Sequence, residues 1–355
     1  MDLYVSKLGN NSDGLSWPTA YHDLQTTLLR VPDERGGHRV IVRPDTYAEA
    51  NLFPTSTGAT GAYNGLIGDF DGSLGSGATG WVVIDSGAPE VIVRTALDPS
   101  MGNPPFELLD EGDVQSEWGM KSVDWWCAFR SDPHNSGSAW DRWRFQGLYA
   151  TGSEFGMGWD MTCDVGCEFS VEVDNCVGIG RFAGAGAIAH RARAGEPCLF
   201  RNSWFMNLDT WGDCGGVYIR GEDDTMPEHP HAVFENCTIT SPKKALQSAW
   251  AGVGERNTRV SFKDCRLVTL NFSQPRGEPA QVIRCESDDG RQLHVDLEDC
   301  VLVGYKVFGA RAGEVSYTTK GAVSAYVEYE QPVPEGMQRL REWPVEVFAD
   351  LLPHR

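Results

Sequence analysis

The chain has 355 residues and a formal net charge of −20, because it contains 50 Asp and Glu residues and 30 Lys and Arg residues. This charge disfavours nucleic acid as a partner, since an acidic surface repels a polyanion. It leaves an anionic polysaccharide open, because a local basic groove can lie on an acidic body. No apolar run reaches the length of a membrane-spanning helix, so no membrane partner is expected.

The first residues predict a short strand, a loop and a helix. The strand covers residues 3–7, and no secretory leader precedes it, so the expected location is the cytoplasm, or the cell exterior after removal of a leader. Residues 21–29 predict an amphipathic helix with Leu24, Leu28 and Leu29 on one side. Residues 38–47 then predict a strand that ends in a proline turn.

Three segments of this region carry a family resemblance: Tyr4-Val-Ser, Asp13-Gly-Leu-Ser-Trp-Pro-Thr-Ala, and Arg39-Val-Ile-Val-Arg-Pro-Asp-Thr-Tyr. With the helix between them, they resemble the N-terminal part of right-handed parallel β-helix proteins of the pectate-lyase-like superfamily. In that superfamily the helix closes the open end of the solenoid, and the Pro-x-Thr-Tyr turn closes the first coil. The resemblance implies the fold and leaves the activity open, since the superfamily contains lyases, hydrolases, epimerases and non-catalytic binders. No lyase motif matches residue by residue, so no catalytic residue is carried over.

Residues 51–162 predict early coils with long loops rich in Gly, Ser, Thr and Asp. The second half of this region is rich in tryptophan, at positions 118, 125, 126, 140, 143 and 159. An indole suits the face of a sugar ring, but we expect most of these side chains to pack between coils or under loops.

A recurring segment organises the second half of the chain. An alternating strand is followed by Asn or Asp and then by a small residue, at Cys176, Ser203, Cys237, Cys265 and Cys300. A repeat of this length with period-2 alternation predicts a solenoid of β-strands. We interpret Asn or Asp as a corner residue and Cys as an inward-pointing filler. A disulfide or metal framework is the disfavoured alternative, because the cysteines come one per coil.

Each coil adds a further strand, and most of these strands end beside a basic side chain, at His190 and Arg191, Arg220, Arg284, and Arg311. Stacked in parallel, such groups could match the regular acidic groups of a polymer. The alternative is a solvated edge in which each cation has an acidic partner, such as Glu222 beside Arg220. Past residue 311 the pattern changes to two alternating strands and a terminal helix at 345–352, which we interpret as a C-terminal cap.

Polar and aromatic residues gather between positions 207 and 250, and they form the candidate site. The candidate catalytic residues are His190, Asp209, Asp213, Arg220, Asp223, Asp224 and Lys244. The candidate substrate-binding residues are Arg191, Trp211, Lys243, Trp250 and Arg284. No cofactor is required by the sequence, although Asp223 and Asp224 are candidate calcium ligands.

Three functions remain open at this stage. The first is β-elimination on a uronate-containing polysaccharide, with Arg220 or Lys244 as the base or the neutralising group, and His190 or His229 as alternatives. The second is glycoside hydrolysis by two carboxylates among Asp209, Asp213, Asp223 and Asp224. The third is a non-catalytic glycan binder. The partner is a polysaccharide or oligosaccharide in each case, and the oligomeric state is left open.

The sequence therefore predicts an all-β chain that forms a single right-handed parallel β-helix domain over residues 1–355. The N-terminal cap and first coil cover 1–50, the loop-rich early coils 51–162, the regular coils 163–311, and the C-terminal cap 312–355.

Overall fold

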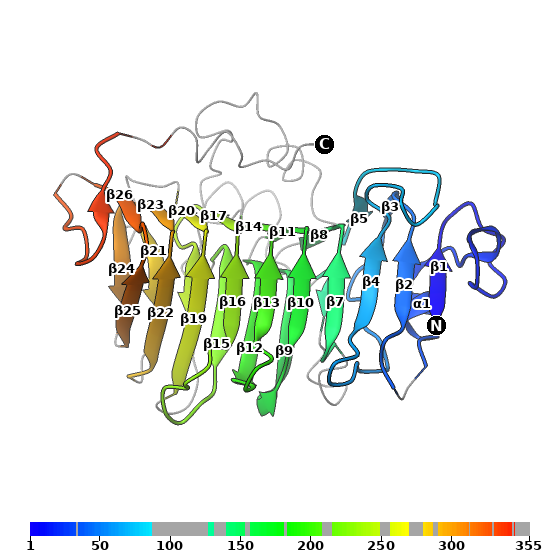
Figure 1. Ribbon diagram of the computed structural model, residues 1–355, viewed down its shortest axis with the longest axis horizontal. Helices are drawn as coiled ribbons and strands as arrows, with labels where there is room; N and C mark the ends of the chain where they lie inside the picture. The colour runs from blue at the N-terminus through cyan, green and yellow to red at the C-terminus, as the bar shows by residue number, and fades with distance from the viewer. Residues whose placement is uncertain are drawn as a thin grey trace, which may run out of the picture.

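The computed structural model describes residues 1–32, 35–86, 127–130, 140–152, 157–180, 183–207, 215–248, 256–269, 280–286, 290–311, 313–328, 330–342 and 344. In this part of the chain three parallel sheets wrap around one axis and form a right-handed parallel β-helix (Figure 1). The predicted fold class is confirmed.

In the middle of the solenoid each coil contributes one strand to each sheet, in chain order, and among the described residues sheet C has fewer strands than sheets A and B. Sheet A contains β1 (Asp2–Val5), β2 (Arg39–Val42), β4 (Asn64–Gly68), β7 (Trp143–Gln146), β10 (Val171–Asp174), β13 (Cys198–Arg201), β16 (Ala232–Glu235), β19 (Asn257–Lys263), β22 (Gln292–Glu298) and β25 (Glu314–Lys320). Sheet B contains β3 (Thr46–Tyr47), β5 (Val82–Ile84), β8 (Leu148–Gly152), β11 (Val177–Gly180), β14 (Trp204–Asn207), β17 (Thr238–Ser241), β20 (Arg266–Thr269), β23 (Val301–Gly304), β26 (Ser324–Val327) and β27 (Gln338–Arg339). Sheet C contains β6 (Phe129–Arg130), β9 (Met157–Glu168), β12 (Ala183–Arg191), β15 (Val217–Gly221), β18 (Leu246–Ser248), β21 (Gln281–Cys285) and β24 (Lys306–Ala310).

The corner between sheets A and B is built by the recurring Asn or Asp. Its φ lies between 47° and 52° in five coils, at Asn175, Asn202, Asn236, Asp264 and Asp299. Asn and Asp adopt this left-handed conformation more readily than other side chains, because their short polar groups bond to nearby backbone. The chain therefore turns sharply at these positions and continues into the next sheet.

The small residue after each corner is buried, as predicted, at 0–5% exposure. Where this residue is cysteine, its thiol donates to the backbone carbonyl oxygen two residues earlier, as from Cys265 Sγ to the Lys263 oxygen at 3.1 Å. Burial raises the pKa of the Cys176 thiol to about 12, so this residue stays protonated at neutral pH. The column cysteines are free thiols. Cys167 lies outside the column and is disulfide-bonded, so the thiol interpretation does not extend to it.

Stacked aromatic rings fill the middle of the solenoid. Phe200, Phe234 and Phe262 occupy equivalent positions in successive coils and are paired in register. Their ring centroids lie 4.6 and 5.0 Å apart, with interplanar angles of 8° and 17°. Trp140 and Trp143 are fully buried in the same core, which confirms packing between coils for these two indoles. The other four tryptophans of the predicted rich segment have no described side chain.

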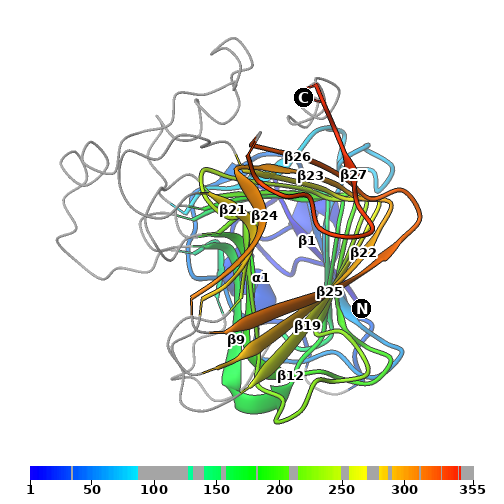
Figure 2. The ribbon, with the colours of Figure 1, turned by 90° about the vertical axis from the view of Figure 1, so that its left-hand side faces the viewer.

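The helix α1 (Leu24–Leu28) lies at the N-terminal end, where Figure 2 shows it within the outline of the coils. Leu24 and Leu28 are buried against the core, and the Asp23 carboxylate caps the helix by accepting from the Thr26 amide at 2.7 Å. Leu29 was predicted on the apolar side, but it is 45% exposed. The helix ends before this residue, which therefore no longer follows the helical period.

The coil rhythm continues beyond residue 311. The two alternating strands predicted there are β25 and β26, and they pair in parallel with β22 and β23 of the preceding coil. They thus add a coil to sheets A and B. The predicted terminal helix at 345–352 lies outside the described residues, and the assignment of the cap stays a prediction. No described helix is long and apolar enough to cross a membrane.

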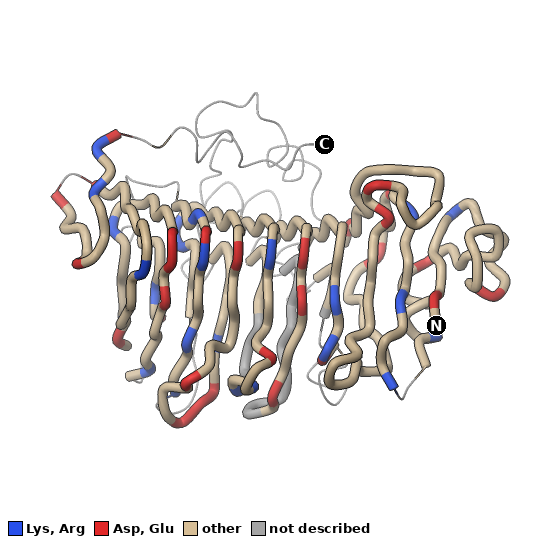
Figure 3. The backbone as a smooth tube through the Cα atoms, viewed as in Figure 1, with Lys and Arg blue, Asp and Glu red and all other residues tan. Residues whose placement is uncertain are grey.

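Ion pairs between neighbouring coils lie on the outer face of sheet A, and Figure 3 shows Lys or Arg (blue) and Asp or Glu (red) positions on its adjacent strands. Arg144 pairs with Glu172 at 2.5 Å, Arg201 with Glu235 at 2.7 Å, and Lys320 with Glu298 at 2.9 Å. Most of these side chains are more than one quarter exposed, so solvent screens the pairs and they add little to the stability of the fold.

The phenylalanine stack generates a test of the core. Replacement of Phe234 by Ala should lower the free energy of unfolding by about 3–5 kcal/mol, because it removes the ring that stacks on both Phe200 and Phe262 and leaves a cavity. Urea unfolding followed by circular dichroism measures this loss. Glu235→Ala on the same strand is the matched control and should cost less than about 1 kcal/mol, since Glu235 is exposed. Equal losses in the two variants would contradict the assignment of Phe234 to the core.

Candidate functional site

A row of buried polar side chains lies on the outer face of sheet C. Val217, Leu246 and Ile283 point inward to the core of this sheet. Because side chains alternate along a strand, the next residues, Tyr218, Gln247 and Arg284, point outward. They are nevertheless 1%, 0% and 5% exposed. A buried polar row outside the core distinguishes this face from sheet A.

The first charged cluster surrounds Glu222, which directly follows β15 and is 4% exposed. Its carboxylate lies 2.9 Å from Arg220 Nε, 3.5 Å from Arg291 Nη1 and 3.6 Å from Arg256 Nε. Arg291 is 3% exposed, whereas the Arg256 side chain is 30% exposed. One buried carboxylate is thus shared among three guanidinium groups. The side chain of Arg256 is the most exposed of the three, so the cluster reaches the surface there.

The second cluster surrounds Glu286, which directly follows β21 and is 8% exposed. Lys244 Nζ lies 3.4 Å from its carboxylate, and Arg284 forms an ion pair with it. Arg311 Nη1 lies 3.9 Å away and its side chain is 60% exposed. Lys244 is 4% exposed and also donates to Gln247 Oε1 at 2.8 Å. Again three cations share one carboxylate, and β18 separates the strands that carry the two clusters.

Asp223 belongs to a separate hydrogen-bonded group. His231 Nδ1 accepts from the Arg259 amide at 3.1 Å, so its proton lies on Nε2, which is 2.8 Å from Asp223 Oδ2. The Ala192 amide donates to the same oxygen at 2.9 Å. Burial alone would raise the pKa of Asp223, but these hydrogen bonds outweigh it and hold the pKa below its ordinary value.

Several predicted site residues are brought together by the fold. Arg220 lies in the Glu222 cluster, and Lys244 and Arg284 lie in the Glu286 cluster. Arg220 has the acidic partner that the alternative interpretation named. Arg191 lies at the edge, where its Nη2 is 3.9 Å from Asp224 Oδ2.

Other predicted residues are placed less closely or not at all. Lys243 is half-buried, and its carbonyl oxygen accepts from the Gln281 amide at 2.8 Å. His190 pairs with Gly221 at a register shift of sheet C, and its side chain is not described. The predicted Asp209, Trp211, Asp213 and Trp250 lie outside the described residues.

Residues that the sequence did not single out complete both clusters. Glu286, Gln247, Arg256 and Arg291 were not predicted to belong to the site. One signal could have revealed the glutamates, because the triplet Arg-x-Glu occurs at Arg220-Gly-Glu222 and again at Arg284-Cys-Glu286. No comparable signal marks Arg256 or Arg291, which reach Glu222 from a later part of the chain.

Asp223 and Asp224 do not fit the predicted calcium site. Asp223 Oδ2 already accepts from His231 and Ala192, while Asp224 forms ion pairs with Arg256 and Arg191. A cation between the two carboxylates would face a guanidinium group. The two carboxylates also contact different partners. No group of three His, Cys, Asp or Glu suited to a metal occurs among the described residues.

Comparison with known proteins supports the fold. No protein-family model matches the chain, and no curated protein is similar to it in sequence. The pectate lyase Pel9A has a TM-score of 0.53, with 12% identity over 95% of this chain and 73% of that one. A rhamnogalacturonan lyase has a TM-score of 0.46, with 11% identity over 92% of this chain and 74% of that one. At this identity the likeness to the pectate lyase shows the fold alone, and the chain is a parallel β-helix protein.

The lowered pKa of Asp223 predicts that the stability of the fold depends on pH. Because its pKa is lower in the folded protein, its stabilisation is fully present above the ordinary value of 3.8 and is lost as the pH falls through the lowered value. Asp223→Asn should therefore reduce the free energy of unfolding at pH 7 by about 1–2 kcal/mol. The difference from the native protein should shrink toward zero in strong acid.

Urea unfolding at pH values about one unit apart, between pH 2 and pH 7, measures this dependence. Asp224→Asn is the matched control, because the Asp224 side chain is 67% exposed and should change stability little. A difference between Asp223→Asn and the native protein that does not change with pH would contradict the role of the charge.

Proposed function

We propose that this protein is a carbohydrate-active enzyme that cleaves a uronate-containing polysaccharide by β-elimination on the outer face of sheet C. The observation that carries the proposal is the excess of cations at this face. Glu222 and Glu286 are each shared among three basic side chains, although the whole chain has a net charge of −20. Basic side chains thus surround both glutamates, and Arg256 in addition pairs with Asp224.

A group of closely spaced basic side chains suits an anionic ligand. A sugar carboxylate that entered between the clusters could form charge-assisted hydrogen bonds with guanidinium groups, which match a carboxylate in geometry. The partly exposed Arg256 and Arg311 would meet the ligand first. The charge distribution therefore favours uronate units over neutral sugars at sheet C.

The chemistry of β-elimination requires a base and a neutralised carboxylate. The base takes the proton from C5, a double bond forms between C4 and C5, and the C4–O bond breaks. The electron pair leaves with the glycosidic oxygen, which then gains a proton. Neutralising the adjacent carboxylate stabilises the negative charge that develops during this step.

Lys244 is our candidate for the base, and Arg220 and Arg284 are our candidates for the neutralising groups. Buried lysine can release its proton and serve as a base, whereas arginine stays protonated. Lys244 is 4% exposed and is held by Gln247 and Glu286. Its partners would orient the amine, and the guanidinium groups would bind the sugar carboxylate.

Hydrolysis is less well supported by the described residues. It needs one carboxylic acid and one carboxylate on opposite sides of the bond. Glu222 and Glu286 are each surrounded by cations, and Asp223 accepts two hydrogen bonds. None of these carboxylates is placed to give a proton to a glycosidic oxygen.

A turnover assay separates the candidate reactions. We expect incubation with a uronate-rich polysaccharide to produce the ultraviolet absorbance of an unsaturated uronate, because the double bond is conjugated with the carboxylate. New reducing ends without this absorbance would indicate a hydrolase instead. A polymer that is bound and stays intact would indicate a binder and would contradict both enzymatic functions.

Substitution of Lys244 tests the assignment of the base. Lys244→Arg keeps the positive charge but cannot accept the proton, so it should lower kcat by roughly 10²–10⁴-fold with a smaller change in KM. Lys263→Ala, an exposed lysine of sheet A, is the control and should retain activity. If Lys244→Arg retained activity, Lys244 would be a neutralising group and the base would lie elsewhere.

A further inference from the structure

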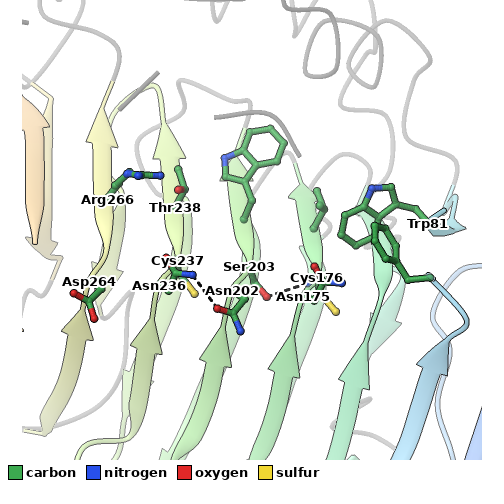
Figure 4. Close-up of a pocket in the computed structure, with 13 residues that line it drawn as sticks. Trp81, Asn175, Cys176, Asn202, Ser203, Asn236, Cys237, Thr238, Asp264 and Arg266 are labelled. Carbon is green, nitrogen blue, oxygen red and sulfur yellow. Dashed lines mark hydrogen bonds between the residues drawn. The ribbon is translucent and has the colours of Figure 1, made fainter. Parts of the chain in front are cut away.

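A hollow of about 310 Å³ lies over the corner between sheets A and B, away from the charged clusters of sheet C. Figure 4 shows that its lining comes from successive coils. Three corner asparagines, Asn175, Asn202 and Asn236, line it together with two indoles, Trp81 and Trp204. The corner residues thus form part of a concave surface in addition to turning the chain.

The corner amides form an ordered row. Asn236 Nδ2 donates to Asn202 Oδ1 at 2.9 Å, and Asn202 Nδ2 donates to Asp174 Oδ1 at 2.8 Å. Each amide has two N–H groups and an oxygen with two lone pairs, so the row leaves donors and acceptors for a ligand. Asn202 and Asn236 are exposed, and the coil spacing repeats these groups about every 4.8 Å.

The two indoles point independently to a ligand. Trp204 is 5% exposed, and its Nε1–H has no hydrogen-bond acceptor among the residues described. Within the same part of the chain, the buried Nε1–H of Trp81 also has none, and this indole packs on Phe70 with centroids 4.6 Å apart. A buried donor without an acceptor is unfavourable. Both indoles line the hollow but their nitrogens are shielded from solvent, so a hydroxyl oxygen of a bound ligand could accept from them once the rings turn toward it.

We propose that this hollow is a second glycan-binding site, specific for a neutral saccharide chain. Amides that both donate and accept match sugar hydroxyl groups, and an indole offers an apolar face to the C–H groups of a sugar ring. The charged lining residues are Asp264 and Arg266, which are of opposite sign, so the hollow has no excess charge for an anion. It therefore differs in ligand class from the cation-rich face of sheet C.

Affinity electrophoresis in native gels tests the proposal, with galactan, arabinan, xylan and hydroxyethylcellulose as neutral probes and polygalacturonate as the anionic probe. We expect at least one neutral polysaccharide to retard the full-length protein. Trp81→Ala should weaken this binding at least tenfold, because it removes the partly exposed indole. Trp204→Phe keeps an aromatic ring but removes the N–H, and it should weaken binding by a smaller factor.

Asn236→Gly provides a third variant, since glycine accepts the left-handed corner at φ 51° and removes the amide. It should also weaken neutral-glycan binding while leaving the circular dichroism spectrum unchanged. Arg144→Ala, on the exposed face of sheet A, is the control and should bind as the native protein does.

The test separates this site from the proposed function at sheet C. Lys244→Ala should lose turnover of the uronate polymer and keep neutral-glycan binding. Failure of all four neutral probes to retard the protein would overturn the second site. Unchanged affinity in the folded Trp81→Ala and Asn236→Gly variants would overturn it as well, as would retardation by polygalacturonate alone. None of these results depends on whether the protein cleaves uronates.

Discussion

The left-handed turn at the corner between sheets A and B is the constraint on which the other features depend. At Asn175, Asn202, Asn236, Asp264 and Asp299 the backbone leaves one sheet and enters the next within a single residue. The buried side chain that follows keeps each corner at the same depth in the core. Because the corners stay in register, the phenylalanines of successive coils stack and every sheet remains parallel. The outer faces thereby become ladders, in which residues far apart in the chain lie on neighbouring strands.

Charge is organised differently on two of these faces. On sheet A exposed residues of opposite sign pair across coils, and such pairs add little to stability. On sheet C the carboxylates of Glu222 and Glu286 are buried and outnumbered by their cations. Burying charges carries a desolvation cost that ion pairing often fails to offset. A buried cluster of basic residues that does little for stability is better explained by a ligand than by folding, and this is why a uronate is proposed there.

The corner asparagines turn the chain and also line the hollow. The conformation that suits Asn at the turn also directs a row of amides to the surface, where they bond to one another along the solenoid. Long segments between the early strands bring Trp81 to the same place, although more than a hundred residues separate it from Asn202 and Asn236. The solenoid thus provides two surfaces of different chemistry: a face on sheet C that is rich in basic residues, and an amide-lined hollow at the corner of sheets A and B, whose two charged residues are of opposite sign.

The sequence by itself determined the repeating part of this protein. Period-2 strands, corner residues and buried cysteines are local features of each coil, and so are the basic residues at the strand ends, such as Arg220 and Arg284. What lies beside these residues was decided by the tertiary structure. Arg256 and Arg291 reach Glu222 from later coils, and the loops between the strands differ in length, so spacing along the chain does not reveal these contacts. The same holds for the pairing of His231 with Asp223, which occupies one carboxylate oxygen of a predicted calcium ligand. A repeat specifies its own turn, whereas a charge cluster or a hollow needs the packing of several coils.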